Sequence, residues 1–269
     1  MTGRARRLSA HIGYLFNDIA LKERPAAARR AGFDAVEHPQ PFAVPAVEMA
    51  AIIKGEGLTF AQLAAGNGDA AKGEKGIAAL PGREAEFRES FLRSIDYAET
   101  VGAPYVHPMA GVAPKDADAA TVSATYLANL AFAVEACRGR DCSVLVEAIS
   151  GAAVPGYHIA TLSDVLKAAD AVAPSEIFVL LDTFHASCNG EDPADFASAN
   201  VARIGHVHIA DHPGRHEPGT GTLQFVPFLA TLIAQDYSGA IGFEYIPTAG
   251  TEAGLGWMPS WQKQLGQDQ

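Results

Sequence analysis

Short apolar runs and longer amphipathic stretches alternate along the whole chain. Runs rich in Val, Ile and Leu, each of roughly four to eight residues, are typical of buried strands. Eight segments follow this pattern: Leu8–Tyr14, Ala35–His38, Leu58–Ala64, Tyr105–Pro108, Ser143–Ile149, Ile177–Asp182, Ile204–Ile209 and Ala240–Tyr245. Between most of them apolar residues recur every three or four positions, as at Phe87, Phe91 and Ile95, and this spacing predicts helices. The clearest helical stretches are Asp18–Ala31, Pro45–Gly55, Arg83–Val101, Ala119–Cys137, Thr161–Ala173 and Phe225–Gln235.

This regular alternation predicts an α/β fold. Strands separated by helices pair in parallel and are joined by crossover helices. Eight such units fit a closed (β/α)8 TIM barrel better than an open doubly wound sheet, which is the second choice. No change in composition marks a domain boundary, so we expect one domain over residues 1–269, with the barrel at about 8–258 and a C-terminal tail at 259–269.

Polar side chains stand near the ends of the last four predicted strands. They are Glu147 in SVLVEAIS, Asp182 in IFVLLDTFH, His206 and His208 in IGHVHIAD, and Glu244 in AIGFEYIP. Barrel strands are buried on both faces, so a charged residue in one of them needs a physical reason. Consecutive strands are neighbours in a barrel, and successive separations of 35, 26 and 36 residues, counted through His208, each match one strand–helix unit. We therefore expect these groups to converge at the carboxyl-terminal end of the barrel.

Such a cluster favours a metal site. Three carboxylates packed together raise one another's pKa unless a cation lies between them. Oxygen ligands with one imidazole suit Mn²⁺, Mg²⁺ or Co²⁺ better than a metal that prefers thiolates. Any one of these residues alone has a structural explanation as a hydrogen-bond anchor, but four in register predict one divalent ion. His206 and His208 share a face of a regular strand, so their spacing does not decide which of them is the ligand.

The net charge and composition limit the classes of binding partner that this chain can have. The formal net charge is −11, and an acidic protein is a poor match for nucleic acid or for an anionic membrane. Cys137, Cys142 and Cys188 form no CxxC pair, which indicates reduced thiols in a cytoplasmic protein. No window of 18 consecutive apolar residues is present, so we expect no membrane span. A small-molecule substrate is the remaining expectation.

Several motifs resemble the hydroxypyruvate isomerase family. They are GEKGIAALPGREAEFR (Gly73–Arg88), LDTFH (Leu181–His185), GHVHIAD (Gly205–Asp211), EPGTG (Glu217–Gly221), FEYIP (Phe243–Pro247) and TEAGLGWM (Thr251–Met258). The similarity runs from about Leu8 to Met258. That family belongs to the xylose isomerase-like TIM barrels, which also include the tagatose and psicose 3-epimerases.

The resemblance implies roles for individual residues. Glu147 and Glu244 would be the two acid/base carboxylates that also bind the metal, and Asp182 and His208 would complete the ligand set. This implication selects His208 over His206. His185 resembles a substrate-contacting histidine of these barrels. Three further residues are predicted to bind substrate, with a structural or surface role as the alternative for each: Glu37, His107 and Arg215, whose planar guanidinium suits a carboxylate.

The chain departs from the family's usual residues in four motifs. His208 stands where hydroxypyruvate isomerases usually carry Gln and the sugar epimerases carry His. The family's EPIN is EAIS here, which places Ser150 at its end. Its EYKP is EYIP, with Ile246 in place of Lys, and its EPGTGE ends in Thr222. The predicted metal ligands are retained while the residues around them differ.

The expected activity is a metal-dependent aldose–ketose type isomerisation in carbohydrate metabolism. It would interconvert a small hydroxy-ketone and hydroxy-aldehyde acid or sugar, related to hydroxypyruvate and tartronate semialdehyde or to a 2-oxo-tetronate, through a metal-stabilised ene-diolate. A ketose 3-epimerase is the nearest alternative, and His208 favours it. An abasic-site endonuclease needs more metals and a basic DNA track, and a non-catalytic sugar-binding barrel would be revealed by the absence of turnover. By analogy we expect a dimer or tetramer.

Overall fold

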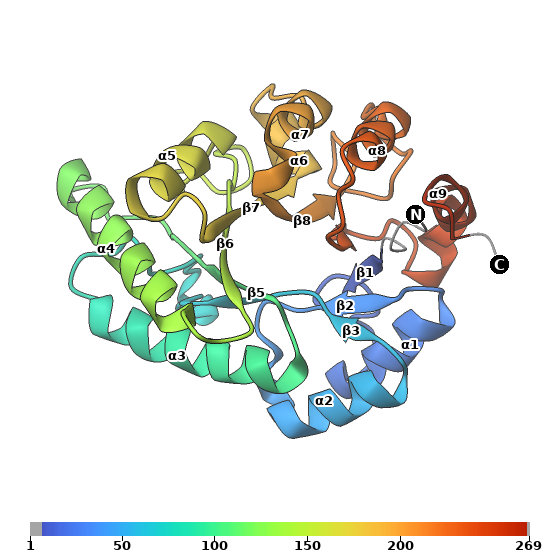
Figure 1. Ribbon diagram of the computed structural model, residues 1–269, viewed down its shortest axis with the longest axis horizontal. Coiled ribbons are helices and arrows are strands. Elements are labelled where there is room, and N and C mark those ends of the chain that lie inside the picture. Colours follow the sequence, from blue (N-terminus) through green and yellow to red (C-terminus); the bar gives the residue numbers. More distant parts are fainter. Residues whose placement is uncertain (1–6, 268–269) are drawn as a thin grey trace.

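The computed structural model, which describes residues 7–267, has a single parallel sheet with the strand order β3-β2-β1-β9-β8-β7-β6-β5-β4 (Figure 1). The strands are β1 (Leu8–His11), β2 (Ala35–Glu37), β3 (Thr59–Phe60), β4 (Leu63–Ala65), β5 (Tyr105–Pro108), β6 (Ser143–Glu147), β7 (Ile177–Asp182), β8 (Ile204–Ile209) and β9 (Ile241–Phe243). The two end members, β3 and β4, are separated in the chain only by Ala61 and Gln62. They are two halves of one interrupted strand, so the sheet closes on itself. The predicted TIM barrel is confirmed, and the open sheet is excluded.

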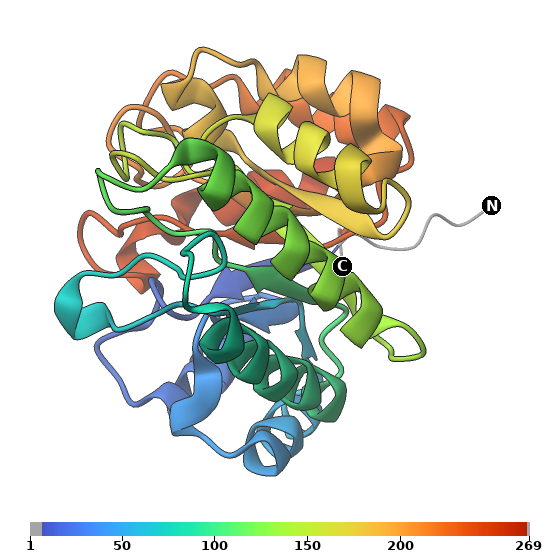
Figure 2. The same cartoon turned by 90° about the vertical axis from the view of Figure 1, so that its left-hand side faces the viewer.

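Helices surround the strands on the outside (Figures 1 and 2). They are α1 (Arg24–Arg30), α2 (Ala46–Gly55), α3 (Glu84–Val101), α4 (Ala119–Cys137), α5 (Leu162–Val172), α6 (Thr183–Cys188), α7 (Pro193–Asn200), α8 (Phe225–Ala234) and α9 (Met258–Gln264). Five short 3-10 helices lie in the connections, at Leu21–Glu23, Pro41–Ala43, Ala70–Lys72, Val201–Arg203 and Glu252–Trp257. The six predicted helices are all present, and five of them lie within a few residues of their expected ends. The helix predicted at Asp18–Ala31 begins later, with a 3-10 turn at Leu21–Glu23 followed by α1 at Arg24. The sequence pattern did not predict α6, α7 and α9.

The C-terminal segment is part of the packed structure. Trp257 stacks on Phe243 of β9 with ring centroids 4.0 Å apart and an interplanar angle of 18°. Trp261 of α9 meets the same phenylalanine edge-on at 5.1 Å and is itself buried. The expected tail at 259–269 therefore begins with a helix that covers the barrel. Residues 1–6 and 268–269 lie outside the described part of the chain.

α4 is long and apolar enough to cross a membrane by length and composition alone. It contacts β6 and its neighbours α3 and α5. Its buried side chains include Tyr126, Leu130 and Val134, which belong to the core. This is the packing of an outer barrel helix with one face on the strands.

We expect Trp257→Ala to lower the free energy of unfolding by roughly 3–5 kcal/mol, because it removes a large aromatic ring from a packed core. Urea denaturation measures this change. Val226→Ala is the control, since Val226 is 64% exposed on α8 and its truncation should cost less than about 0.5 kcal/mol. Equal losses in the two variants would show that the aromatic stack does not hold the C-terminal segment on the barrel.

Candidate metal centre

Four adjacent strands bring the four predicted ligands together. Asp182 on β7 is directly opposite His208 on β8, and His208 is opposite Gly242 on β9. Glu147 ends β6, which pairs with β7. Glu244 follows β9, and its backbone N–H donates to the carbonyl of Ile209 at 3.1 Å, so it continues the β8–β9 ladder. All four side chains therefore stand at the carboxyl-terminal end of the barrel.

The donor atoms of this group are close enough to surround one ion. One atom from each of Glu147, Asp182, His208 and Glu244 lies within 4.8 Å of all the others. Nδ1 of His208 is 3.2 Å from Oε2 of Glu244, 3.9 Å from Oε1 of Glu147 and 4.0 Å from Oδ2 of Asp182. The imidazole thus points at all three carboxylates.

The local structure at Asp182 leaves one oxygen for a ligand. Asp182 is the N-cap of α6, and its Oδ1 accepts hydrogen bonds from the backbone N–H groups of Phe184 at 2.7 Å and His185 at 3.0 Å. Its other oxygen, Oδ2, faces the cluster. The helix start thereby fixes the carboxylate in an orientation that a metal requires.

The cluster also contains buried polar atoms that form no hydrogen bond with the described part of the chain. Oε1 of Glu147 and Nδ1 of His208 are buried without a hydrogen-bond partner among the described residues. Buried polar atoms of this kind carry a substantial free-energy cost unless a ligand meets them. Carboxylate oxygens with a single imidazole match the preferences of Mn²⁺, Mg²⁺ and Co²⁺. The residues present fit a divalent ion.

The two glutamates have opposite electrostatic environments. Burial raises the pKa of Glu147 well above its usual value, and the nearby charge of Glu244 raises it further. Burial acts in the same direction on Glu244, but Arg215, His11 and His208 together hold the pKa of Glu244 well below its usual value. In the absence of a metal Glu147 therefore holds a proton while Glu244 is ionised.

Arg215 supplies positive charge at the edge of the cluster. Its Nη2 donates to Oε2 of Glu244 and lies 3.4 Å from Oδ2 of Asp182. Its guanidinium lies 5.3 Å from the ring of Tyr14 and 5.4 Å from the ring of Phe184. Burial would lower the pKa of Arg215, but the charges of Glu244 and Asp182 raise it, so the side chain stays cationic. A cation held beside the cluster can meet a negatively charged ligand.

The cluster opens into a cavity of about 410 Å³. The predicted residues His107, His185 and Arg215 line it, together with Glu147, His208 and Glu244. Nδ1 of His107 is 3.6 Å from Oε2 of Glu147, and burial lowers the pKa of His107 to about 3, so this imidazole is neutral. Asp182 and Glu37 do not line the cavity.

Glu37 has a different environment from the one predicted for it. Its carboxylate is fully buried and faces His206 and His208 inside the barrel. The contacts of Glu37 are with these two histidines rather than with the cavity. A substrate contact for Glu37 thus has no support in this geometry.

Three cavity residues were missed in the sequence. His11 ends β1, and its Nε2 is 3.2 Å from Oε1 of Glu244. The rule that singled out polar residues at the ends of the last four strands would have found it if applied to the first. Tyr14 lies in the turn that follows β1, and the pKa of its hydroxyl is raised to about 12, mainly by Glu244 and then by burial. Lys75 lies in the GEKG loop.

The GEKG loop holds Lys75 at the cavity from both sides. On one side, Oε1 of Glu74 accepts a hydrogen bond from Arg83 at 2.7 Å and its Oε2 accepts one from the backbone N–H of Asp69, also at 2.7 Å. On the other side, Gly76 has a φ of 130° and lies so close to the Met109 carbonyl that a Cβ would approach it to 2.5 Å. Lys75 itself makes no ion pair among the described residues and lines the cavity. It is an exposed cation on an anchored loop.

The departures from the family pattern lie at different distances from the cavity. Oγ of Ser150 is 3.2 Å from Nδ1 of His185, so this change touches a cavity residue. Ile246 is 47% exposed and does not line the cavity. Thr222 donates through its backbone and side chain to the carbonyl of His212, so its role is in the loop after β8.

Comparison with known proteins identifies relatives along nearly the whole chain. Residues 25–261 match the family model described as xylose isomerase-like TIM barrel. A 2-oxo-tetronate isomerase from Cupriavidus necator is 41% identical over 94% of this chain and 97% of its own, and the hydroxypyruvate isomerase of Escherichia coli is 31% identical over 95% and 99%. A crystal structure named AP endonuclease, family 2, from Brucella melitensis superposes with a TM-score of 0.91 at 31% identity, covering 95% of this chain and 99% of the other.

Proposed function

This chain belongs to the xylose isomerase-like TIM barrel family, and we propose that it is a divalent-metal-dependent isomerase of small hydroxy-keto acids. The substrate class we infer is that of a 2-oxo-tetronate or of hydroxypyruvate. The observation that carries the proposal is the convergence of Glu147, Asp182, His208 and Glu244 on one point beside a cavity at the carboxyl-terminal end of the barrel. Relatives named for such isomerisations, at 31–41% identity over nearly full length, support it.

The four converging side chains would hold the ion. A bound Mn²⁺, Mg²⁺ or Co²⁺ supplies Lewis-acid charge that stabilises an ene-diolate. His208 would bind through Nδ1 and Asp182 through Oδ2, because these are the atoms that face the other ligands. Glu147 and Glu244 contribute both to the ligand set and to proton transfer.

The two glutamates would move the proton between adjacent carbons. The ionised glutamate removes the proton from the carbon that bears the hydroxyl group. The electron pair of that C–H bond becomes the C=C bond of an ene-diolate, and the π pair of the carbonyl moves onto its oxygen. The protonated glutamate then delivers a proton to the carbon that was the carbonyl, and the hydroxyl proton passes to the former carbonyl oxygen, so carbonyl and hydroxyl exchange places. Glu244, with its lowered pKa, suits the first role and Glu147, with its raised pKa, the second; in the reverse reaction the roles exchange. His185 would bind a substrate oxygen.

The charges of the cavity favour an acid over a neutral sugar. Lys75 and Arg215 are its two lining cations among the described residues. We assign them to the substrate carboxylate, with Lys75 as the ammonium that has no protein partner and Arg215 as the planar fork. A free ketose has no negatively charged group that would pair with these cations. The two cations therefore favour this proposal over a 3-epimerase.

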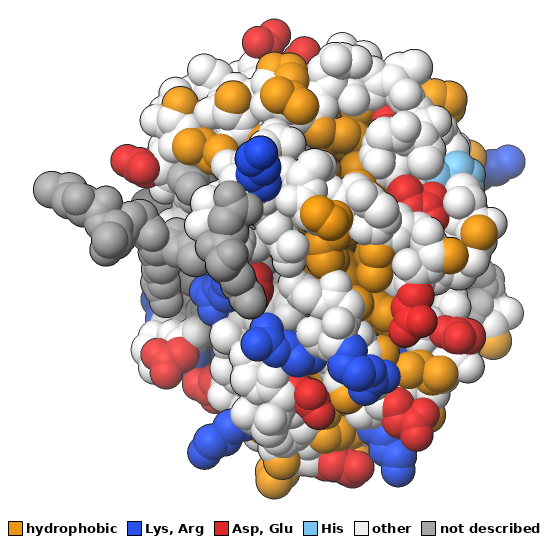
Figure 3. Space-filling model, turned by 90° about the vertical axis from the view of Figure 1, so that its right-hand side faces the viewer, with side chains coloured by type: hydrophobic (Ala, Val, Ile, Leu, Met, Phe, Trp, Pro, Cys, Tyr) orange, Lys and Arg blue, Asp and Glu red, His pale blue; other side chains and the backbone are white. Residues whose placement is uncertain are grey.

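Two other activities have less support. An endonuclease, the name attached to one solved relative, needs a basic surface for the phosphate backbone. The net charge is −11, and on the face shown in Figure 3 Lys and Arg side chains alternate with Asp and Glu. A non-catalytic sugar-binding barrel has no need for two glutamates with oppositely shifted pKa values.

Purified protein supplied with Mn²⁺ should isomerise a 2-oxo-tetronate or hydroxypyruvate and incorporate solvent deuterium into the product, since the proton passes through exchangeable carboxyl groups. NMR of the product in D₂O measures both turnover and exchange, with a free ketose tested in parallel. EDTA should abolish turnover and Mn²⁺ or Mg²⁺ should restore it. Full activity after removal of all metal, or turnover of the ketose alone, would refute the proposal.

Glu147→Gln and Glu244→Gln should each reduce kcat at least about a hundredfold, because general acid–base catalysis contributes at least that factor. Circular dichroism checks that both variants remain folded. Glu48→Gln, on the exposed side of α2, is the matched control and should keep wild-type kcat. Retention of most activity by either cavity variant would remove that glutamate from proton transfer.

Lys75→Gln should raise KM for the acid substrate roughly tenfold, because a hydrogen bond between charged groups contributes about 1.5–3 kcal/mol. The change in kcat should be smaller. Lys72→Gln is the control from the same loop, since Lys72 pairs with Asp69 and does not line the cavity. Unchanged KM in Lys75→Gln would assign the substrate carboxylate to another group.

A further inference from the structure

Behind the metal cluster lies a second group of buried polar side chains, made of Glu37, His206 and His208. Each of the three is 2% exposed or less. Oε2 of Glu37 is 2.6 Å from Nε2 of His206 and 3.4 Å from Nε2 of His208. One carboxylate oxygen thus faces two imidazoles from the same strand, β8.

The two ring nitrogens of His208 face opposite ways. Nδ1 points at the three metal-site carboxylates and Nε2 points at Glu37. An ion bound at Nδ1 takes the lone pair of that nitrogen, which leaves the ring hydrogen on Nε2, the nitrogen that faces Glu37. The position of Glu37 therefore selects the tautomer of His208 that presents Nδ1 to a metal.

Two imidazole nitrogens approach the buried Glu37 carboxylate. They are Nε2 of His206 and Nε2 of His208, and apart from these contacts neither oxygen of Glu37 has a hydrogen-bond partner among the described residues. Burying a carboxylate in a barrel interior is costly, so its presence requires a compensating role.

The backbone leaves room for this arrangement. Gly242 on β9 lies opposite His208, and a Cβ on it would overlap Oε1 of Glu37 and come within 2.7 Å of Nε2 of His206. Any side chain at position 242 would push Glu37 off the two histidines. The strand is thus shaped around the carboxylate.

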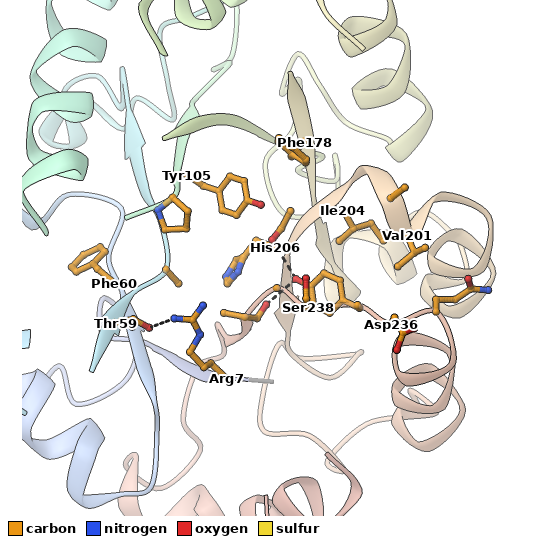
Figure 4. Close-up of a pocket in the computed structure, with 18 of the residues that line it drawn as sticks. Arg7, Thr59, Phe60, Tyr105, Phe178, Val201, Ile204, His206, Asp236 and Ser238 are labelled. Atoms are coloured by element: carbon orange, nitrogen blue, oxygen red, sulfur yellow. Dashed lines mark hydrogen bonds between the residues drawn. The ribbon is translucent and has the colours of Figure 1, made fainter. Parts of the chain in front are cut away.

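His206 forms the far wall of this group. It lines a cavity of about 590 Å³ at the amino-terminal end of the barrel, where its imidazole lies among Tyr105, Phe178 and Ile204 (Figure 4). Its Nε2 is turned from that cavity to Glu37. His206 therefore holds Glu37 from the side away from the metal centre.

We propose that Glu37 is a positioning residue for the metal ligand His208, and that His206 holds Glu37 in place. The inference rests on the metal centre of the proposed function, but not on the substrate or on the isomerisation. It predicts one bound ion per chain, with Glu37 outside the ligand set.

Metal binding tests this inference directly. Glu37→Gln keeps the shape of the side chain and removes the charge that fixes the His208 tautomer, so Mn²⁺ affinity should fall about 10- to 100-fold. Titration of the metal-free protein with Mn²⁺, followed by electron paramagnetic resonance, gives the affinity and the stoichiometry. The visible absorption spectrum of the Co²⁺-loaded variant should also differ from that of the wild type, because the imidazole ligand is reoriented.

Glu217→Gln is the matched control. Glu217 is also a buried carboxylate, but it accepts hydrogen bonds from the backbone and side chain of Thr248 and lies outside both clusters. Its variant should bind Mn²⁺ with wild-type affinity and leave the Co²⁺ spectrum unchanged. A merely structural effect of losing a buried carboxylate would appear in both variants.

The outcomes separate the possibilities. Wild-type affinity and spectrum in a folded Glu37→Gln protein would overturn the positioning role, and two ions per wild-type chain would overturn it in favour of Glu37 as a ligand. If Glu37→Gln does not fold, the Mn²⁺ affinity of His206→Gln is measured instead. A measurable loss of affinity would support the proposal, and no loss would refute it. A wild-type protein that binds Mn²⁺ but isomerises none of the acids would refute the proposed function and leave this inference standing.

Discussion

The rest of this structure depends on keeping several like charges together in one small buried volume. Glu147, Asp182 and Glu244 approach the same imidazole at the carboxyl ends of their strands. Mutual repulsion and desolvation would drive such a group apart or force protons onto it unless positive charge were present. Arg215 meets part of this need from the loop after β8, and a divalent ion would meet the rest. The ring of strands, the helix start at Asp182 and the aromatic stack behind β9 all act to keep these side chains in place.

Most of the fold could be predicted from the spacing of apolar residues along the chain, because the barrel strands are apolar on both faces and the outer helices are amphipathic. Three helices could not be predicted from the sequence, and each has a physical reason. α6 spans only six residues, and its N-cap Asp182 is also the last residue of β7, so its sequence pattern resembles the end of a strand. α7 carries a start signal, with Asp192 as N-cap and Pro193 in the first turn, but its apolar face is small. α9 is short and contributes through Trp261 rather than through a repeating stripe.

The candidate ligands could be predicted because each lies in line with a strand and so has a fixed direction. Loop residues could not be placed in the same way. The orientation of Lys75 depends on the contacts of Glu74 with Arg83 and of Gly76 with Met109, which connect separate parts of the chain. The direction of Glu37 could not be predicted for another reason. A residue at a strand end can turn towards the cavity or towards the interior, and the space that Glu37 occupies is provided by Gly242, which is distant in the sequence.

The large amino-terminal cavity has a consequence for engineering this protein. Filling it with bulkier apolar side chains is an obvious route to greater thermostability, because empty space in a core weakens packing. Its walls are not equivalent, however. Ala61 lines this cavity and is not among the residues that pair with Glu37, whereas a change that displaces His206 would be transmitted through two imidazoles and a carboxylate to the opposite end of the barrel. Stabilising designs should therefore fill this space from the β3 side and leave the β8 wall as it is.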